Sequence, residues 1–568
     1  MMNRLQKLLA LVLTAVMICA AVPALAMTED EYAAAAKIET TLADDYTGKT
    51  VILHSNDVHG AIAGYAYIVG LKKVFEDKGA EVILADVGDF SQGTPYVSTT
   101  KGETAIAMMI IAGYDVAALG NHEFDYGYAQ LMNTINEATD PELENKTQFL
   151  CADIILRETG ESMLDGHTIL TTEGGLKLGF FGIDTPETAT KVNPGLITEI
   201  SFVFGDDLYA YAQAEIDALK EEGADLVIGL THLGVDVESE ANGYRSVDLY
   251  AHTTGADLLL DGHSHTVMTA GENGEPIQSA GTKFNYVGVV VIDNETKAIE
   301  DNFLMPAKTG AYEMVKDTET ATWAQLFIDT VDEEYSAVFA TSEVLLTGDR
   351  APGNRTQETN LGDLITDAMV WSVVKEGGLS QEEKNVVGIT NGGGIRAPIN
   401  EGDISMLNIN TVLPFGNTVA VVYVTGAELL EALEASTYCT PDPIGGYPQT
   451  SGITWTLDTT KAFDQGENYP DSTYYAPASI QRVTIEAVNG EPFDPEATYA
   501  VVTNNFCAAG GDTYYVFNRA YSEGAGFDTG IPLDEAVMAY VADVLNGNIT
   551  AEAYGEPRGS ETQIAAAE

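Results

Sequence analysis

The feature that most constrains the fold is a series of short apolar runs. Each run is followed by polar residues of the types that bind metals or catalyse reactions. The runs at 51–53, 82–85, 116–119, 226–230 and 258–260 lead into the polar segments 54–57, 86–89, 120–122, 231–232 and 261–263. Continuous apolar runs of this length predict strands buried on both faces. Helix-like stretches such as 208–222 lie between them. We therefore predict an α/β layered sandwich whose site lies at the carboxyl ends of its strands.

The chain has 568 residues, which is too many for one hydrophobic core. Residues 311–345 look helical and charged, which predicts a linker between a first domain at 49–310 and a second, mixed α/β domain at 346–550. In the second domain we expect a helix at 360–375 and a hairpin at 450–457, together with strands at 386–389, 419–424 and 499–502. A lead-in at 27–48 and an acidic tail at 551–568 complete the chain.

The first 26 residues have the character of a signal peptide. Arg4 and Lys7 precede an apolar stretch from Leu8 to Val22, and Ala24-Leu25-Ala26 offers the small residues that signal peptidase needs. A run of about 15 apolar residues is short for a membrane span. We expect cleavage and export to the periplasm, the cell surface or the medium, with no transmembrane segment in the mature chain. Lipidation of Cys19 is the alternative.

The charge balance limits the partners. Removing residues 1–26 leaves 25 basic and 86 acidic side chains, a formal charge of −61. Such an excess repels polyanions, which argues against a nucleic acid polymer or an anionic membrane as partner. An anionic substrate would need cations supplied locally, by metal ions or by a few well-placed arginines.

Histidines gather beside acids at the ends of the predicted strands. All eight lie in the first half of the chain, and five follow apolar runs beside two aspartates and an asparagine: His59, His122, His232, His263 and His265, with Asp57, Asp89 and Asn121. Metal binding is the usual reason for such a cluster. Two divalent ions that share a carboxylate can catalyse phosphoryl transfer. Asp57-x-His59 and His263-x-His265 would each place two side chains on one side of an extended segment.

These residues resemble the calcineurin-like metallophosphoesterases over about 210 residues. The matching blocks are Asp57-Val58-His59, Gly88-Asp89, Gly120-Asn121-His122-Glu123, Thr231-His232 and Gly262-His263-Ser264-His265. The resemblance implies a four-layer αββα sandwich with two metal ions. One ion would take Asp57, His59, Asp89 and His265, and the other Asp89, Asn121, His232 and His263. His122 would act on the phosphate, oriented by Asp125, unless Asp125 only caps a helix.

Longer phrases are similar to the bacterial 5′-nucleotidase and UDP-sugar hydrolase family. They are 53–60, 86–95 and 120–127 in the first domain, and 358–365, 391–396, 413–417 and 506–512 in the second. The resemblance covers nearly all of residues 50–545. It implies a substrate-binding second domain.

Seven residues of the second domain suit a nucleotide: Arg355, Asn391, Arg396, Phe415, Asn417, Phe506 and Asp512. The two aromatic rings can stack on a base. The asparagines can bond its edge, and Asp512 can accept bonds from ribose hydroxyls. The arginines can grip phosphate in a bidentate manner.

The sequence thus predicts an exported 5′-nucleotidase with two divalent ions, which hydrolyses nucleoside 5′-phosphates to nucleoside and phosphate. UDP-sugar hydrolysis could coexist with this activity. The alternatives are a 2′,3′-cyclic-nucleotide 2′-phosphodiesterase with 3′-nucleotidase activity and, in a different class, a non-catalytic nucleotide-binding surface protein. The ligand types accept Zn, Mn, Co or Fe. The oligomeric state stays open.

Overall fold

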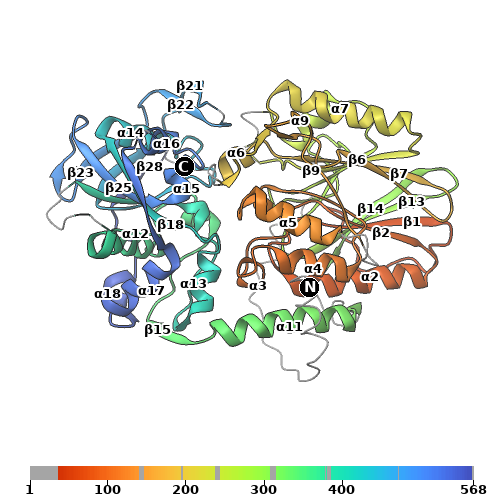
Figure 1. The fold of residues 1–568 in the computed structure, drawn as a ribbon, viewed down its shortest axis with the longest axis horizontal. Coiled ribbons are helices and arrows are strands. Elements are labelled where there is room, and N and C mark those ends of the chain that lie inside the picture. Colours follow the sequence, from red (N-terminus) through yellow and green to blue (C-terminus); the bar gives the residue numbers. More distant parts are fainter. Residues whose placement is uncertain are drawn as a thin grey trace. The chain divides into compact units, whose positions relative to one another are not determined.

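A computed structural model describes residues 36–139, 146–192, 196–236, 239, 243–307, 315–377, 379, 385–470, 472–522 and 524–565 (Figure 1). The predicted signal peptide lies outside these residues. Among them, no helix combines the length and the apolar character that crossing a membrane requires.

The chain divides into two compact units. The N-terminal unit comprises most residues up to Val331, and the C-terminal unit comprises those from Asp332 together with the short segments 93–95 and 189–198. The predicted helical linker contains α11 (Thr318–Tyr335), but its end forms β15 (Val338–Ser342), which pairs with β17 (Gly402–Ser405) of the C-terminal unit.

Two six-stranded sheets form the centre of the N-terminal unit. The first has the order β14 (Ala298–Pro306), β13 (Tyr286–Asp293), β1 (Lys49–Ser55), β2 (Glu81–Asp86), β3 (Val116–Ala118), β4 (Gln148–Leu150). The second has the order β11 (Val267–Met268), β12 (Ile277–Ala280), β10 (Leu258–Asp261), β9 (Leu226–His232), β7 (Lys177–Asp184), β6 (His167–Thr171). Every residue of β3, β9 and β10, and every residue of β2 after Glu81, is buried, as the continuous apolar runs predict.

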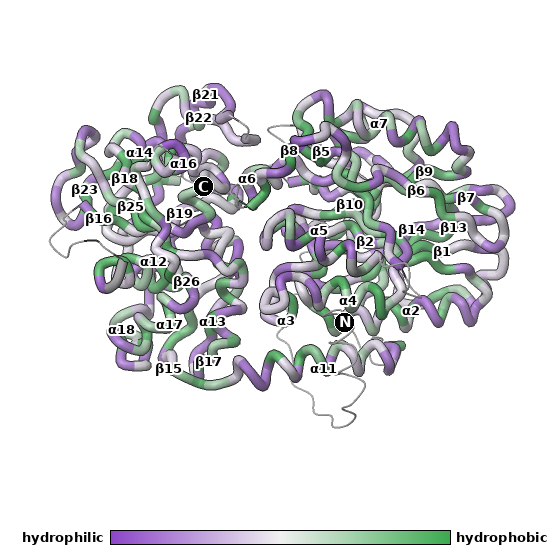
Figure 2. Tube along the Cα trace, viewed as in Figure 1, coloured by the Kyte–Doolittle hydropathy of each residue, from purple (hydrophilic) through white to green (hydrophobic). Residues whose placement is uncertain are grey.

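Helices cover the outer faces of the two sheets. One core lies between the sheets and includes Ile52, Phe180 and Leu260, whereas another joins the second sheet to α7 (Asp206–Glu221). Figure 1 shows α7 and α9 (Ser246–His252) on one side of the sheets, with α2 (Tyr65–Asp77) and α4 (Glu103–Ala112) on the other. Figure 2 shows hydrophobic residues following central strands such as β1 and β10. The predicted four-layer αββα sandwich is confirmed.

Parallel pairing of the strands places the polar segments that follow them at one edge of each sheet. β1 pairs in parallel with β2, and Ser55 lies opposite Asp86. In the second sheet β9 pairs in parallel with β10, and Thr231 lies opposite Asp261. Parallel neighbours end at the same edge of a sheet, so the polar segments after these four strands are neighbours within their sheets.

The C-terminal unit is built on a five-stranded mixed sheet. Its order is β19 (Pro448–Ser451), β16 (Val386–Asn391), β25 (Thr498–Asn504), β18 (Thr418–Thr425), β26 (Gly526–Pro532). One core packs α12 (Asn360–Ser372) and α17 (Leu533–Asp543) against one face of this sheet. A second core packs α14 (Gly426–Ala435) and α16 (Tyr515–Ser522) against the other. The separate mixed α/β second domain is confirmed.

The hairpin predicted at 450–457 is wrong. β19 joins the five-stranded sheet, whereas β20 (Ile453–Asp458) joins a second sheet with the order β24 (Glu491–Pro492), β23 (Val483–Val488), β20, β28 (Glu561–Ile564). Gly452 lies between the two strands with φ +80°, a left-handed conformation that glycine adopts without strain. The turn at this glycine redirects the chain from one sheet to the other.

The segment 551–568, expected as an acidic tail, is part of the C-terminal unit over its described residues. α18 (Ala551–Tyr554) begins it, and β28 then pairs in parallel with β20. Arg558 Nη2 lies 2.7 Å from Asp367 Oδ2, and the Glu561 carboxylate accepts the amide of Glu358 at 2.8 Å. Acidic composition suggested a solvated end, but Arg558 and Glu561 have partners elsewhere in the chain.

Two buried aspartates, Asp153 and Asp184, contact each other at the end of β7. Asp153 Oδ1 accepts the amide of Asp184 at 3.0 Å, whereas its Oδ2 has no hydrogen-bond partner in the described part of the chain. Burial raises the pKa of Asp153 to about 7 from the ordinary value of 3.8, and burial also raises the pKa of Asp184. The folded chain therefore holds protons that the unfolded chain releases near pH 4.

Asp153→Asn is expected to stabilise the protein at pH 8 and to leave it unchanged near pH 4. Since the folded-state pKa of Asp153 is the higher one, the wild type loses stability as pH rises from about 4 to about 7. One pKa unit corresponds to about 1.4 kcal/mol, so the variant should gain on the order of a few kcal/mol above pH 7. Melting temperatures measured from pH 4 to pH 9 test this, with the exposed Asp207→Asn as control. A gain that does not depend on pH would contradict it.

Candidate active site

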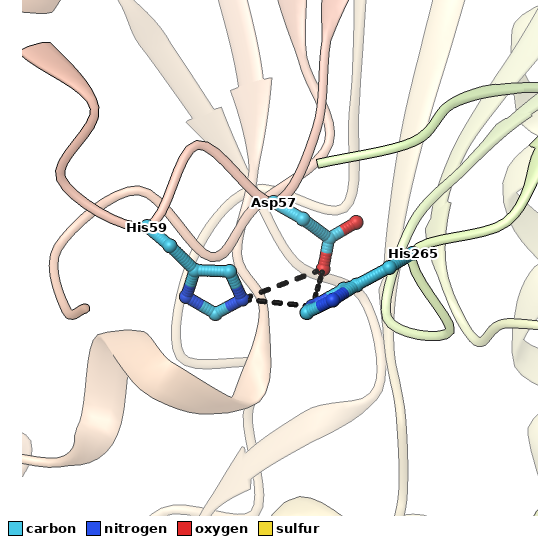
Figure 3. Close-up of side chains that lie close together, drawn as sticks. All are labelled: Asp57, His59 and His265. Atoms are coloured by element: carbon cyan, nitrogen blue, oxygen red, sulfur yellow. Dashed lines mark hydrogen bonds and ion pairs between the residues drawn. The ribbon is translucent and has the colours of Figure 1, made fainter. Parts of the chain in front are cut away.

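The first group of predicted metal ligands comes from the segments after β1 and β10. Asp57 and His59 follow β1, and His265 follows β10; Figure 3 shows the three side chains pointing toward one another. His59 Nε2 lies 2.9 Å from His265 Nε2, which lies 3.4 Å from Asp57 Oδ1. Two ring nitrogens facing each other can share only one proton, and a carboxylate beside them adds negative charge. This donor set fits a cation.

The second group is centred on Asp89, His232 and His263. His232 Nε2 lies 3.2 Å from Asp89 Oδ2, and His263 Nδ1 lies 3.0 Å from Asn121 Oδ1. Asp89 Oδ2 is also 3.8 Å from His59 Nε2 in the first group. Asp89 therefore contacts both groups, as a bridging carboxylate would. A third set able to hold an ion, His59, Asp89 and His122, overlaps these two.

A hydrogen bond at Nδ1 orients the His232 ring so that Nε2 can bind a metal. Its Nδ1 lies 2.7 Å from the carbonyl oxygen of Val87, which can only accept, so Nδ1 carries the proton. Nε2 is then the nitrogen that can bind a metal; it is buried, lies 3.2 Å from Asp89 Oδ2, and makes no well-aligned hydrogen bond within the described residues. Buried polar atoms are rarely left without a partner. A metal ion at Nε2 would supply one.

The loops that carry these ligands have an unusual backbone. Five of the seven predicted ligands have positive φ: Asp57 (49°), His59 (44°), Asp89 (61°), His263 (71°) and His265 (57°). The expectation of extended segments at 57–59 and 263–265 is therefore wrong. His263 and His265 contact different groups, which the sequence left open as one of two arrangements. Such a conformation costs a non-glycine residue about 1–3 kcal/mol and is concentrated at functional sites.

The two aspartates differ in their pKa values. Burial raises the pKa of Asp57 to about 6. Burial acts in the same direction on Asp89, but the facing His232 and His122 outweigh it and hold the pKa of Asp89 well below its usual range. The carboxylate that contacts both groups thus stays ionised to a lower pH than that of Asp57, which suits a bridging ligand.

His122 is held by two hydrogen bonds. Its Nδ1 lies 2.7 Å from Asp125 Oδ2, and its backbone amide donates to Asp89 Oδ1 at 2.9 Å. Asp125 stands at the end of the short helix η2 (Asn121–Phe124), but its carboxylate contacts the imidazole of His122. The His122 side chain is 12% exposed, so a substrate can reach it. This geometry supports the orienting role predicted for Asp125.

Glu123 anchors the loop of the shared aspartate, a role that the sequence did not assign. One carboxylate oxygen accepts the amides of Asp89 and Gly120, both at 2.7 Å. The other accepts the amides of Phe90 and Ser91, both at 3.0 Å. A single buried side chain therefore satisfies four backbone donors around Asp89. Its place in the block 120–123 was the only sequence signal.

Several predicted substrate residues lie together in the C-terminal unit. Asn391 ends β16, and its side-chain amide donates to Asp512 Oδ2 at 2.8 Å. The side chain of Asn504, which the sequence analysis missed, donates to Asn391 Oδ1 at 3.0 Å. A Cβ on Gly511 would lie 2.3 Å from the ring of Phe506, so glycine is needed for this loop to pack on the ring.

Phe415 and Asn417 line a pocket of the same unit. Its other lining residues are Thr390, Gly394, Leu413, Gly416, Asn504, Leu533 and Asp534. The Arg396 guanidinium lies 5.6 Å from the centroid of the Phe415 ring, within cation–π range. Arg355 does not line the pocket; its carbonyl accepts the amide of Ile444 at 3.2 Å. Arg396, Phe506 and Asp512 are not among the residues lining the pocket.

Two family models match the chain. Residues 50–267 match the calcineurin-like phosphoesterase model, and residues 338–519 match the model of the 5′-nucleotidase C-terminal domain. Protein UshA of Escherichia coli is 28% identical over 556 residues, covering 89% of this chain and 93% of the relative. The trifunctional nucleotide phosphoesterase protein YfkN of Bacillus subtilis is 30% identical over 519 residues. That match covers 84% of this chain but 33% of YfkN, so the chain spans about a third of that relative.

The fold has a close match among solved structures. The crystal structure of a 5′-nucleotidase precursor from Thermus thermophilus superposes with a TM-score of 0.73 and 25% sequence identity, covering 91% of this chain and 100% of that one. With a calcineurin-like phosphoesterase domain followed by a 5′-nucleotidase C-terminal domain, the chain belongs to the 5′-nucleotidase family and is a metal-dependent phosphoric monoester hydrolase.

Proposed function

We propose that this chain is an exported 5′-nucleotidase that uses two divalent ions to hydrolyse nucleoside 5′-phosphates to nucleoside and phosphate. The observation that carries the proposal is Asp89, whose carboxylate contacts His59 in one group of ligands and His232 in the other. One ionised carboxylate between two sets of imidazoles is the arrangement that a two-metal phosphoesterase needs.

Seven residues would hold the ions. Asp57, His59, Asp89 and His265 form one set, and Asp89, Asn121, His232 and His263 form the other. When bound, two such ions lower the pKa of water and neutralise the charge of the phosphate. Mixed imidazole, carboxylate and amide ligands accept Zn, Mn, Co or Fe, and availability usually decides among them.

His122 would act on the leaving oxygen. Since Asp125 engages Nδ1, Nε2 is the nitrogen left to donate a proton or to stabilise negative charge on the phosphate. The Asp125 carboxylate favours the protonated imidazole and fixes its orientation.

The C-terminal unit would select the nucleoside. Phe415 and Phe506 would supply aromatic rings for base stacking, and Asn391 and Asn417 would supply amides. Asp512 offers a carboxylate to ribose, and Arg355 and Arg396 offer charge to phosphate. UDP-sugars carry the same groups and are proposed as further substrates.

Phosphate release from AMP, a 3′-nucleotide, a 2′,3′-cyclic nucleotide and a UDP-sugar tests the assignment. We expect AMP to be the best substrate and a chelator to abolish turnover. A higher kcat/KM for the 3′-nucleotide and the cyclic nucleotide than for AMP would support the 2′,3′-cyclic-nucleotide phosphodiesterase alternative. Metal-independent nucleotide binding without turnover would instead indicate the non-catalytic surface protein. A mature N-terminus at Met27 in the exported fraction would support the signal peptide.

Phe415→Ala is expected to lower kcat/KM for AMP by about 10-fold, because base stacking contributes about 1–3 kcal/mol. Turnover of p-nitrophenyl phosphate, which has no base, should stay within about twofold of the wild type. Phe463→Ala, a half-buried phenylalanine elsewhere in the C-terminal unit, serves as the matched control. Equal losses on both substrates would contradict a role of Phe415 in base recognition.

A further inference from the structure

Glu187 contacts the metal-binding residues although no sequence motif marks it. It lies three residues beyond β7, and its side chain is 1% exposed. Its Oε2 lies 3.1 Å from Nε2 of His263. We infer that Glu187 is a positioning residue, which accepts the Nε2 proton of His263 and thereby makes Nδ1 the nitrogen that binds metal. The inference rests on the proposed two-metal function.

The two nitrogens of His263 face different acceptors. Nδ1 lies 3.0 Å from Asn121 Oδ1, and Nε2 faces the Glu187 carboxylate. A neutral imidazole has one proton, so without a cation one nitrogen would face an acceptor with nothing to donate. A cation shared by Nδ1 and the Asn121 oxygen removes this conflict, and the proton then lies between Nε2 and Glu187.

At His232 a hydrogen-bond acceptor also selects the nitrogen that binds metal, but the roles of Nδ1 and Nε2 are exchanged. There a backbone carbonyl, that of Val87, accepts the proton of Nδ1 and leaves Nε2 as the ligand atom. At His263 the acceptor is a carboxylate, which carries a full negative charge and makes the imidazole a stronger donor to a metal. The two histidines of the second group are thus fixed in opposite tautomers.

Two hydrogen bonds hold the backbone beside Glu187. The amide of Thr188 donates to the carbonyl of Thr185 at 3.1 Å, and the Thr188 hydroxyl donates to Asp184 Oδ2 at 2.6 Å. The backbone of His263 is fixed separately, since its amide lies 3.1 Å from both carboxylate oxygens of Asp57. With both backbones fixed, the Glu187 contact determines how the imidazole ring is oriented.

The test compares Glu187→Gln and Glu187→Leu with the wild type. Metal content after dialysis against buffered Mn²⁺, and Mn²⁺ affinity by calorimetry, are the readouts. We expect one of two ions to bind about 10- to 100-fold more weakly in Glu187→Gln, and Glu187→Leu to lose it altogether. Glu215→Gln is the matched control, because Glu215 contacts Nδ1 of His167, away from the proposed ligands. Unchanged melting temperatures without metal would exclude a folding defect.

A double-mutant cycle separates positioning from direct ligation. If Glu187 acts through His263, Glu187→Gln should add nothing to the loss of Mn²⁺ affinity in His263→Ala. Additive losses would overturn the inference, as would Glu187→Gln and Glu187→Leu proteins that bind two ions with wild-type affinity. A wild type that binds fewer than two ions would instead contradict the proposed function, so the two failures are distinguishable.

Discussion

His122→Ala is expected to lower kcat for AMP by about 10²- to 10⁴-fold, the usual contribution of a positioned acid–base group, while two metal ions stay bound. The imidazole is oriented by Asp125 at 2.7 Å, and its backbone amide holds Asp89 Oδ1 at 2.9 Å. Replacement by alanine keeps the second contact and removes only the ring. Steady-state kinetics combined with metal analysis of the same sample measure both quantities.

The metal analysis decides between two roles of His122, because His59, Asp89 and His122 also form a group that could hold an ion. A His122→Ala protein with one ion fewer would show that His122 is a ligand and would contradict the acid–base role. His252→Ala, which removes an exposed histidine, is the control for nonspecific effects. Asp125→Asn should give a smaller loss than His122→Ala, since the amide still orients the ring but no longer favours its charged form.

The layers of the fold and the gathering of ligands were predictable from sequence for one physical reason. Buried parallel strands read as continuous apolar runs, and their carboxyl ends meet at one edge. Asp57, Asp89 and His232 each follow such a run, so their proximity required only the strand assignments. The left-handed backbone of Asp57 and Asp89 was not predictable, because short polar residues adopt it only when the surrounding contacts enforce it.

Residues that act through contacts with distant parts of the chain could not be identified from the sequence around them. Glu187 and His263 are 76 positions apart, and Asn504 and Asn391 are 113 positions apart. Neither Glu187 nor Asn504 lies in a block that resembled the family. The segment 551–568 was misjudged for the same reason. Its composition is that of a solvated tail, but Arg558 and Glu561 find partners near residue 360, about 200 positions earlier.

Glu123→Gln is expected to destabilise the N-terminal unit and to weaken metal binding together. The carboxylate offers one oxygen to Asp89 and Gly120 and the other to Phe90 and Ser91. A glutamine has only one oxygen, so either orientation of its amide turns an NH₂ group toward two backbone donors. Each buried donor left unpaired costs about 1–3 kcal/mol, which predicts a loss on the order of 2–6 kcal/mol in the free energy of unfolding.

The loss of activity should follow from the position of Asp89. Because Asp89 contacts both ligand groups, a shift of its loop weakens the binding of both ions. We therefore expect kcat/KM for AMP to fall by at least about 100-fold. Thermal unfolding with and without added Mn²⁺, together with AMP kinetics, measures the two effects. The exposed Glu221→Gln is the control. Wild-type stability with full metal content would contradict the anchoring role. Partial rescue of turnover by excess Mn²⁺ would support it, since saturating metal restores occupancy of ligands that are displaced but present.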